Sequence, residues 1–223
     1  MPTLRTAAVA ALSLSGTAFA DLDLAWKGMV DREAIRYSFD EAYAWDATAR
    51  DRTQFAFAGT LGFQDSDLVL LCIELQQDVT QDLVAYAATS FEAPGTDFER
   101  SLILSSLFTN YYDDTVASGS ASMAAAFAMM TWEIMSENFD GDADVMIDRI
   151  DPSLGAVQFG EYSDAAGIQF AIMRDSLFIA DDSSNLITYR NDQYQDFVGQ
   201  VPAPGAAALL GLAGIMGRRR RRD

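Results

Sequence analysis

The sequence predicts an α+β fold, in which a buried helical pair packs on a strand-rich antiparallel sheet or barrel. Three observations predict it. Short β-branched and aromatic runs occur in two groups, separated by Gly, Asp, Ser and Asn clusters that read as turns. Two segments with helical periodicity lie between the groups. Strands, then helices, then strands in this order are typical of helices packed on an antiparallel sheet. About 180 residues, 21–200, suffice for one globular domain.

The predicted strands are runs of alternating or continuous apolar residues bounded by turn residues. Those before the helical segments cover residues 34–40, 53–59, 67–75 and 82–89. Those after them cover residues 155–162, 168–173, 176–180 and 185–190.

The two helical segments differ in how much of their surface is apolar. Residues 97–114 place Leu104, Leu107 and Phe108 in one stripe after a polar start, which predicts an amphipathic helix. Residues 120–139 are apolar nearly all round, which predicts a helix buried in the core, with Ser120 or Ser118 as its cap.

The charge balance excludes several function classes. The chain has a formal net charge of -18, and residues 21–217 contain nine basic against 32 acidic residues. Such a body repels nucleic acid, so we expect no nucleic-acid partner. Histidine is absent, which removes Ser-His-Asp and Cys-His catalysis, and Cys72 is the sole cysteine.

The first 20 residues have the layout of a secretory signal peptide. Arg5 precedes an apolar stretch, and the small-residue pattern Ala18-Phe19-Ala20 stands before Asp21. We therefore expect a signal helix at 1–20, export through the secretion machinery and cleavage by signal peptidase after Ala20.

Residues 201–223 have the pattern of a second targeting signal. Seventeen uncharged residues, 201–217, precede an arginine cluster. A helix of that length covers about 25 Å, slightly less than a ~30 Å hydrocarbon core. Arginine side chains are costly to move across the membrane, so they stay on its cytoplasmic side. We expect a C-terminal membrane helix that holds the chain at the inner membrane for a time.

This tail resembles the PEP-CTERM class of bacterial sorting signals, with Ala203 at the position of the usual glutamate. The resemblance is carried by Val201, Pro202, Pro204 and Gly205 and by Arg218, Arg219, Arg220, Arg221 and Arg222. It implies an exosortase-type membrane transpeptidase as partner, removal of the tail, and delivery to the cell surface or extracellular matrix. An ordinary C-terminal anchor is the alternative, since charge asymmetry alone would orient it.

The stretches "LVLLCIEL" and "AAAFAMMTWEI" resemble the strand and helix motifs of thioester-type surface domains. In that family a cysteine and a glutamine condense to an internal thioester. Position by position, Cys72 matches the cysteine, Glu74 the acid after it, and Trp132 the helix tryptophan. The glutamine position falls on Ala128, whose methyl group offers no acyl carbon, so a thioester cannot form with Ala128.

Three functions follow from these residues. We expect a non-catalytic exported protein whose partners are extracellular polymer or surface proteins. The first alternative is a covalent adhesin that uses Cys72. The second is a secreted glycoside hydrolase with Glu74 and Glu133 as its carboxylate pair.

The acidic stretch 140–151 resembles an EF-hand loop in its spacing. Its candidate calcium ligands are Asp140, Asp142, Asp144, Asp148 and Asp151. Val145 replaces the glycine of the sharp turn, and aspartate replaces the final bidentate glutamate. A solvated acidic turn is the alternative to a weak extracellular calcium site.

Overall fold

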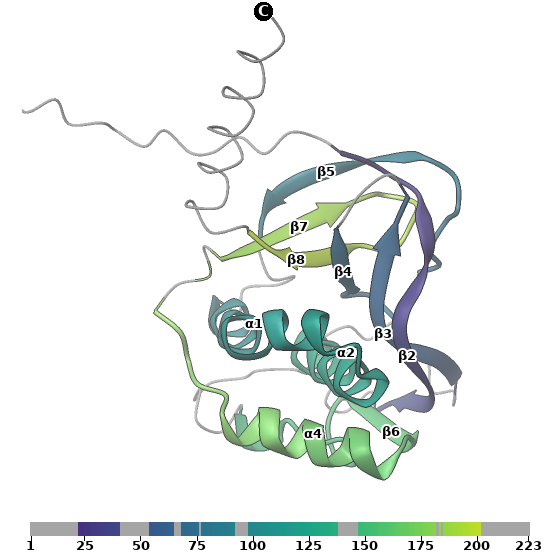
Figure 1. The fold of residues 1–223 in the computed structure, drawn as a ribbon. Coiled ribbons are helices and arrows are strands. Elements are labelled where there is room, and N and C mark those ends of the chain that lie inside the picture. Colours follow the sequence, from purple (N-terminus) through teal and green to yellow (C-terminus); the bar gives the residue numbers. More distant parts are fainter. Residues whose placement is uncertain are drawn as a thin grey trace, which may run out of the picture.

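The computed structural model describes residues 22–40, 54–64, 68–75, 77–91, 98–137, 147–181, 183 and 185–201 (Figure 1). The predicted signal helix at 1–20 and nearly all of the predicted membrane helix at 201–223 lie outside these residues. Among the described helices, none combines the length and apolar character that crossing a membrane requires.

The strands form one antiparallel sheet in the order β1-β5-β7-β8-β4-β3-β2-β6. Their bounds are β1 Leu22–Leu24, β2 Trp26–Phe39, β3 Gln54–Phe63, β4 Val69–Cys72, β5 Val84–Ser90, β6 Val157–Glu161, β7 Leu186–Arg190 and β8 Phe197–Gln200. Only Ala25 separates β1 from β2, yet β1 pairs with β5 and β2 pairs with β3. The sheet therefore curls back on itself as a barrel does, with β6 added outside the ring (Figure 1).

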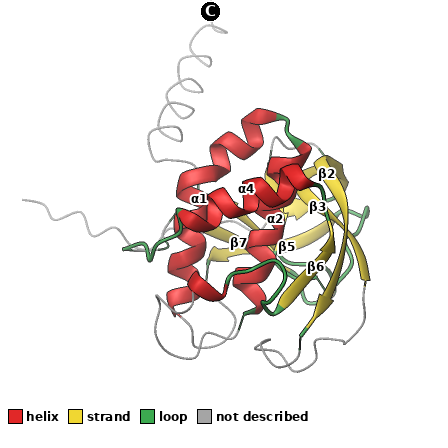
Figure 2. Cartoon of the chain, turned by 90° about the horizontal axis from the view of Figure 1, so that it is seen from below, coloured by secondary structure: helices red, strands yellow, loops and turns green. Residues whose placement is uncertain are grey.

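Three helices, α1 (Phe98–Ser118), α2 (Ala121–Ser136) and α4 (Asp164–Asp175), gather on one side of the strands (Figure 2). The α2 helix contacts β2 and β3 on one side and α4 on the other. All its residues from Ala124 to Met135 are buried, as its apolar sequence predicts. Ser120 caps the start of α2, because its side chain accepts a hydrogen bond from the Met123 N–H at 3.3 Å.

The strand–helix–strand order predicted from sequence is confirmed, but two predicted strands are wrong. Residues 168–173 belong to α4, and residues 176–180 form no strand. The alternation in 168–173 suggested a strand, whereas Ala166, Phe170 and Met173 make the buried stripe of a helix. Ser163 fixes this choice, because its hydroxyl accepts from the Ala166 N–H at 3.1 Å and caps α4.

Candidate functional site

The structure brings Cys72 at the end of β4 against Trp132 on α2. The indole Nε1 of Trp132 donates to the Cys72 carbonyl oxygen at 3.0 Å, and this contact is buried. The Cys72 thiol donates to the Glu74 carbonyl oxygen at 3.1 Å. The strand and helix motifs of the sequence are therefore neighbours, joined by a hydrogen bond between residues 60 positions apart.

The Cys72 thiol is held in its protonated form. Burial raises its pKa to about 12, the Glu74 carboxylate adds to this, and the hydrogen bonds with Trp132 and the Glu74 backbone offset only part of the shift. Because the thiolate is the nucleophilic form, a thiol with this pKa is inert near neutral pH.

Ala128 lies one helical turn before Trp132, so both residues project from the same side of α2. Its side chain is buried, 2% exposed. The helix therefore presents a methyl group on the side that carries the Trp132 contact with β4, and no carboxamide comes from α2 at this position.

A buried glutamine that sequence reasoning missed, Gln195, lies close to Cys72 because both bond to the same carbonyl oxygen. It precedes β8 and is 8% exposed, and its Nε2 donates to the Glu74 carbonyl oxygen. That oxygen also accepts a hydrogen bond from the Cys72 thiol, so the thiol and the carboxamide share one acceptor. No sequence signal could have found this residue, because the pairing of β4 with β8 alone brings it to β4.

Glu133 and Glu137 form a buried pair of carboxyl groups at the end of α2. Glu133 is 0% and Glu137 1% exposed. Their Oε2 atoms accept from the backbone N–H groups of Val157 and Ala156, both at 2.9 Å. Burial raises the pKa of Glu133 well above its usual range, and the adjacent Glu137 raises it further. The Oε1 atoms of both side chains are buried and receive no hydrogen bond from the described residues, so a proton held by Glu133 would provide the missing donor. We therefore assign the shared proton to Glu133.

Two arginines stabilise the negative charge on Glu137. Arg100 is fully buried and donates from Nη2 to the Glu137 carbonyl oxygen at 2.6 Å. Arg149 places Nη1 3.9 Å from Glu137 Oε1. Burial raises the pKa of Glu137, whereas the Ala156 N–H and both arginines act to lower it. The group ties α1, α2 and the start of β6 together.

The two glutamates predicted as a hydrolytic pair have different partners. Glu133 is bound to Glu137 and the β6 backbone, whereas Glu74 Oε2 accepts from the Asp196 N–H at 3.4 Å. Burial, then the nearby Asp196, raises the pKa of Glu74. Because Glu133 is closed to solvent, it lines no open cleft together with Glu74 among the described residues.

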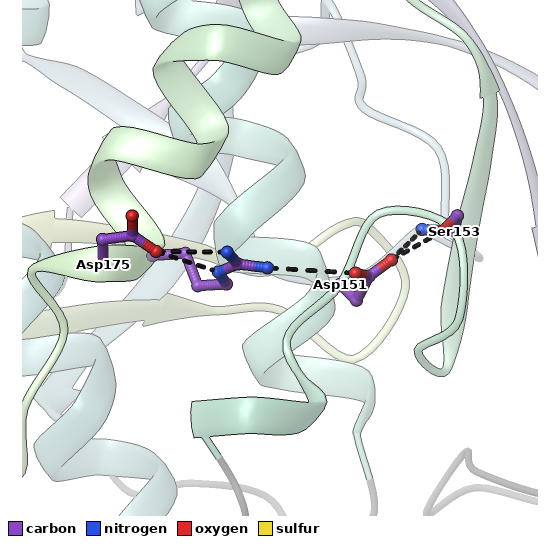
Figure 3. Close-up of polar contacts among 4 residues, drawn as sticks. Asp151, Ser153 and Asp175 are labelled. Carbon is purple, nitrogen blue, oxygen red and sulfur yellow. Dashed lines mark hydrogen bonds and ion pairs between the residues drawn. The ribbon is translucent and has the colours of Figure 1, made fainter.

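Asp151, a predicted calcium ligand, uses its oxygens within the protein (Figure 3). Its Oδ1 accepts from the Ser153 N–H at 2.8 Å and the Ser153 hydroxyl at 2.6 Å, and its Oδ2 lies 3.9 Å from Arg174 Nη1. Burial acts to raise the pKa of Asp151, but Ser153 and Arg174 outweigh it and the pKa is lowered. The carboxylate is therefore anionic and already has partners.

The other predicted ligands give no cluster that the structure describes. Asp148 is exposed, and Asp140, Asp142 and Asp144 lie outside the described residues. Across the ranges that the structure describes, no three acidic, cysteine or histidine side chains gather as metal ligands would. The calcium site at 140–151 stays a prediction.

Comparison with known proteins gives no relative on which to base a function. No family model, curated protein or solved structure matches this chain. The interpretation of the Cys72 region and of the carboxyl pair therefore comes from their geometry alone.

Proposed function

We propose that this chain is a non-catalytic exported protein that acts as a component of the cell surface or of an extracellular polymer matrix. One observation carries the proposal. The groups best suited to chemistry, the Cys72 thiol and the Glu133 carboxyl, are buried and held by internal hydrogen bonds. Both groups are closed to solvent among the described residues, so neither is placed to meet a substrate.

The export part of the proposal is supported by the pattern of residues at the two ends. A signal helix at 1–20 would direct the chain to the secretion machinery and signal peptidase. A membrane helix at 201–223, followed by Arg218–Arg222, would hold it at the inner membrane for an exosortase-type transpeptidase. The acidic body suits solubility in a salty exterior, where screening confines self-repulsion to about 8 Å.

Intact-mass spectrometry of the protein recovered from its producing cell tests this proposal. We expect a chain that begins at Asp21, lacks the arginine cluster and otherwise has its full calculated mass. Finding the uncut chain of 223 residues in the cytosol would refute export and sorting.

The competing function is covalent capture through Cys72, and the nearby Gln195 favours it. The sulfur would attack the Gln195 side-chain carbonyl carbon, forming a C–S bond and releasing the amide nitrogen as ammonia with the thiol proton. The same spectrum distinguishes the two functions, because a thioester lowers the mass by one ammonia and reacts with methylamine. We expect neither, since burial raises the Cys72 pKa to about 12.

A further inference from the structure

The outer face of the β2–β3 hairpin carries two exposed aromatic rings beneath two arginines. Phe55 is 69% and Phe57 52% exposed. The guanidinium carbon of Arg36 lies 4.5 Å from the centre of the Phe55 ring, and that of Arg32 lies 4.3 Å from the centre of the Phe57 ring. We name these four residues the arginine–phenylalanine face.

The register of the two strands builds this face. Arg36 stands directly opposite Phe55, and Phe57 stands opposite Ala34, whose small side chain leaves the ring open. Residues with the opposite alternation, such as Ile35 and Ala58, are 1% and 0% exposed and belong to the core. The arginine–phenylalanine face therefore points away from the core and has no covering element among the described residues.

The face carries two arginines on an acidic chain, and Asp31 and Glu33 alternate with them on β2. Three of the seven basic residues in the described ranges, Lys27, Arg32 and Arg36, lie on β2. Arg36 pairs with Glu161 at 3.0 Å, but both side chains are substantially exposed, so this ion pair is weak. Arg32 makes no ion pair with any described residue. Its guanidinium is free to bind an external anion.

A groove lies at the start of the same hairpin and is lined by residues other than those of the arginine–phenylalanine face. It has a volume of about 450 Å³, and its lining includes Lys27, Val30 and Phe63. Val30 is 57% exposed and stands two residues before Arg32. The hairpin therefore carries a third cation, Lys27, in a partly apolar groove near its start.

We propose that the arginine–phenylalanine face binds an acidic polysaccharide, a chain whose sugar rings carry carboxylates. The apolar C–H face of a sugar ring packs on a phenyl ring, and a guanidinium binds a carboxylate through two parallel hydrogen bonds. Arg32 and Arg36 are four residues apart on β2, which places them about 13 Å apart along the strand. A ligand that uses both must therefore be extended and carry charges at intervals.

Charge density favours this partner over the other anionic polymers. Duplex DNA carries one negative charge per about 1.7 Å of its axis. The chain, with its net charge of -18, repels such a polymer, and the attraction of three cations on β2 is too small to offset that repulsion. A second copy of this chain brings the same net charge of -18. A polysaccharide with one carboxylate per ring is less densely charged, and its rings match the exposed phenyl groups.

This inference rests on the proposed function, since export to a polymer matrix is what would bring the face to such a chain. The test is binding of the purified full chain to polygalacturonate, with fully methyl-esterified polygalacturonate as the uncharged control. Phe57→Ala and Arg32→Gln alter the face. Phe178→Ala is the matched control, because Phe178 is 47% exposed and lies outside the face.

We expect Phe57→Ala and Arg32→Gln each to weaken binding to polygalacturonate by about fivefold. Phe178→Ala should leave it unchanged, and the esterified polymer should bind less tightly than the acidic one. Melting temperatures should stay close to that of the parent chain, because the altered side chains are exposed. Loss of binding can then be attributed to the face.

Several results would overturn the inference. The first two are no binding to polygalacturonate, and a loss of binding in Phe178→Ala as large as in Phe57→Ala. The third is binding of single-stranded DNA as tight as that of polygalacturonate. The fourth is a dimer that Phe57→Ala dissociates, which would make the face a self-association surface. Processed ends without polysaccharide binding refute this inference and leave the proposed function standing. Binding by a chain found uncut in the cytosol refutes the proposed function alone.

Discussion

Replacing Glu133 by glutamine tests whether the buried carboxyl pair shares one proton. Glutamine keeps both contacts, because its oxygen can accept from the Val157 N–H and its NH₂ group can donate to the Glu137 carboxylate. Glu133→Gln therefore imitates the protonated glutamate. Below about pH 4.3 the unfolded chain also holds this proton, so the two proteins should differ by less than about 1 kcal/mol.

Above that pH the two proteins should diverge. The folded pKa of Glu133 is raised by burial, so the native state keeps a proton that the unfolded state releases. The contribution of Glu133 to stability is then fully present below the unfolded pKa and is lost as pH rises towards the folded pKa. The loss is about 1.4 kcal/mol per pH unit, and Glu133→Gln does not suffer it. As the pH rises from 5 the variant should gain stability on the parent chain, and the gain should level off once the pH passes the folded pKa of Glu133.

Urea unfolding at pH 5, 6, 7 and 8 measures this difference. The matched control is Glu161→Gln, since the Glu161 side chain is 62% exposed and its pair with Arg36 lies at the surface. It should show a difference within about 0.5 kcal/mol that barely changes with pH. A difference between Glu133→Gln and the parent that stays constant from pH 5 to 8 would mean that Glu133 is ionised in the native state, and the shared-proton assignment would be refuted.

The remaining predictions concern the Cys72 thiol, the α2 cap and the Asp151 turn. Because burial raises its pKa to about 12, Cys72 should react with iodoacetamide only after unfolding, and fast labelling of the native chain would contradict its burial. Ser120→Ala should lower the free energy of unfolding by about 1 kcal/mol, because it removes the hydroxyl that caps α2, and Ser118→Ala should cost less. Asp151→Asn should lower the free energy of unfolding by about 1 kcal/mol at pH 7, because the lowered pKa of Asp151 stabilises the native state above the unfolded pKa. The difference should shrink as acid protonates the carboxylate of the parent chain. A difference that does not depend on pH would show that the charge of Asp151 does not contribute.

The long elements could be predicted from sequence because their signals are local. The apolar surface of α2 identified a buried helix, and Ser120 marked its start. The alternation in 168–173 misled, because six residues fit a short strand as well as a helical stripe. β1, with three residues, and β8, with four, are too short to carry a pattern. They are strands because β5, β4 and β7 offer them backbone partners.

In the candidate site, too, the local motifs could be identified from sequence, whereas the partners of the buried groups could not. The structure brings Cys72 and Trp132 of the two motifs into contact. It also gives Glu133 a neighbour, Glu137, that the sequence analysis did not name. Glu74 was an alternative partner from another element, whereas Glu137 stands four residues further along α2 and therefore on the same helical face. Its relevance depends on burial, which a sequence does not report.

The sequence by itself determined the elements that depend on neighbouring residues: the helical stripes, the α2 cap, the absence of histidine and the acidity of the body. The tertiary structure alone decided which groups are enclosed. It placed Gln195 beside Glu74, gave Glu133 its proton, and left Phe55 and Phe57 exposed under two arginines. The physical reason is that desolvation and strand register arise between segments far apart in the chain, and no local pattern encodes them.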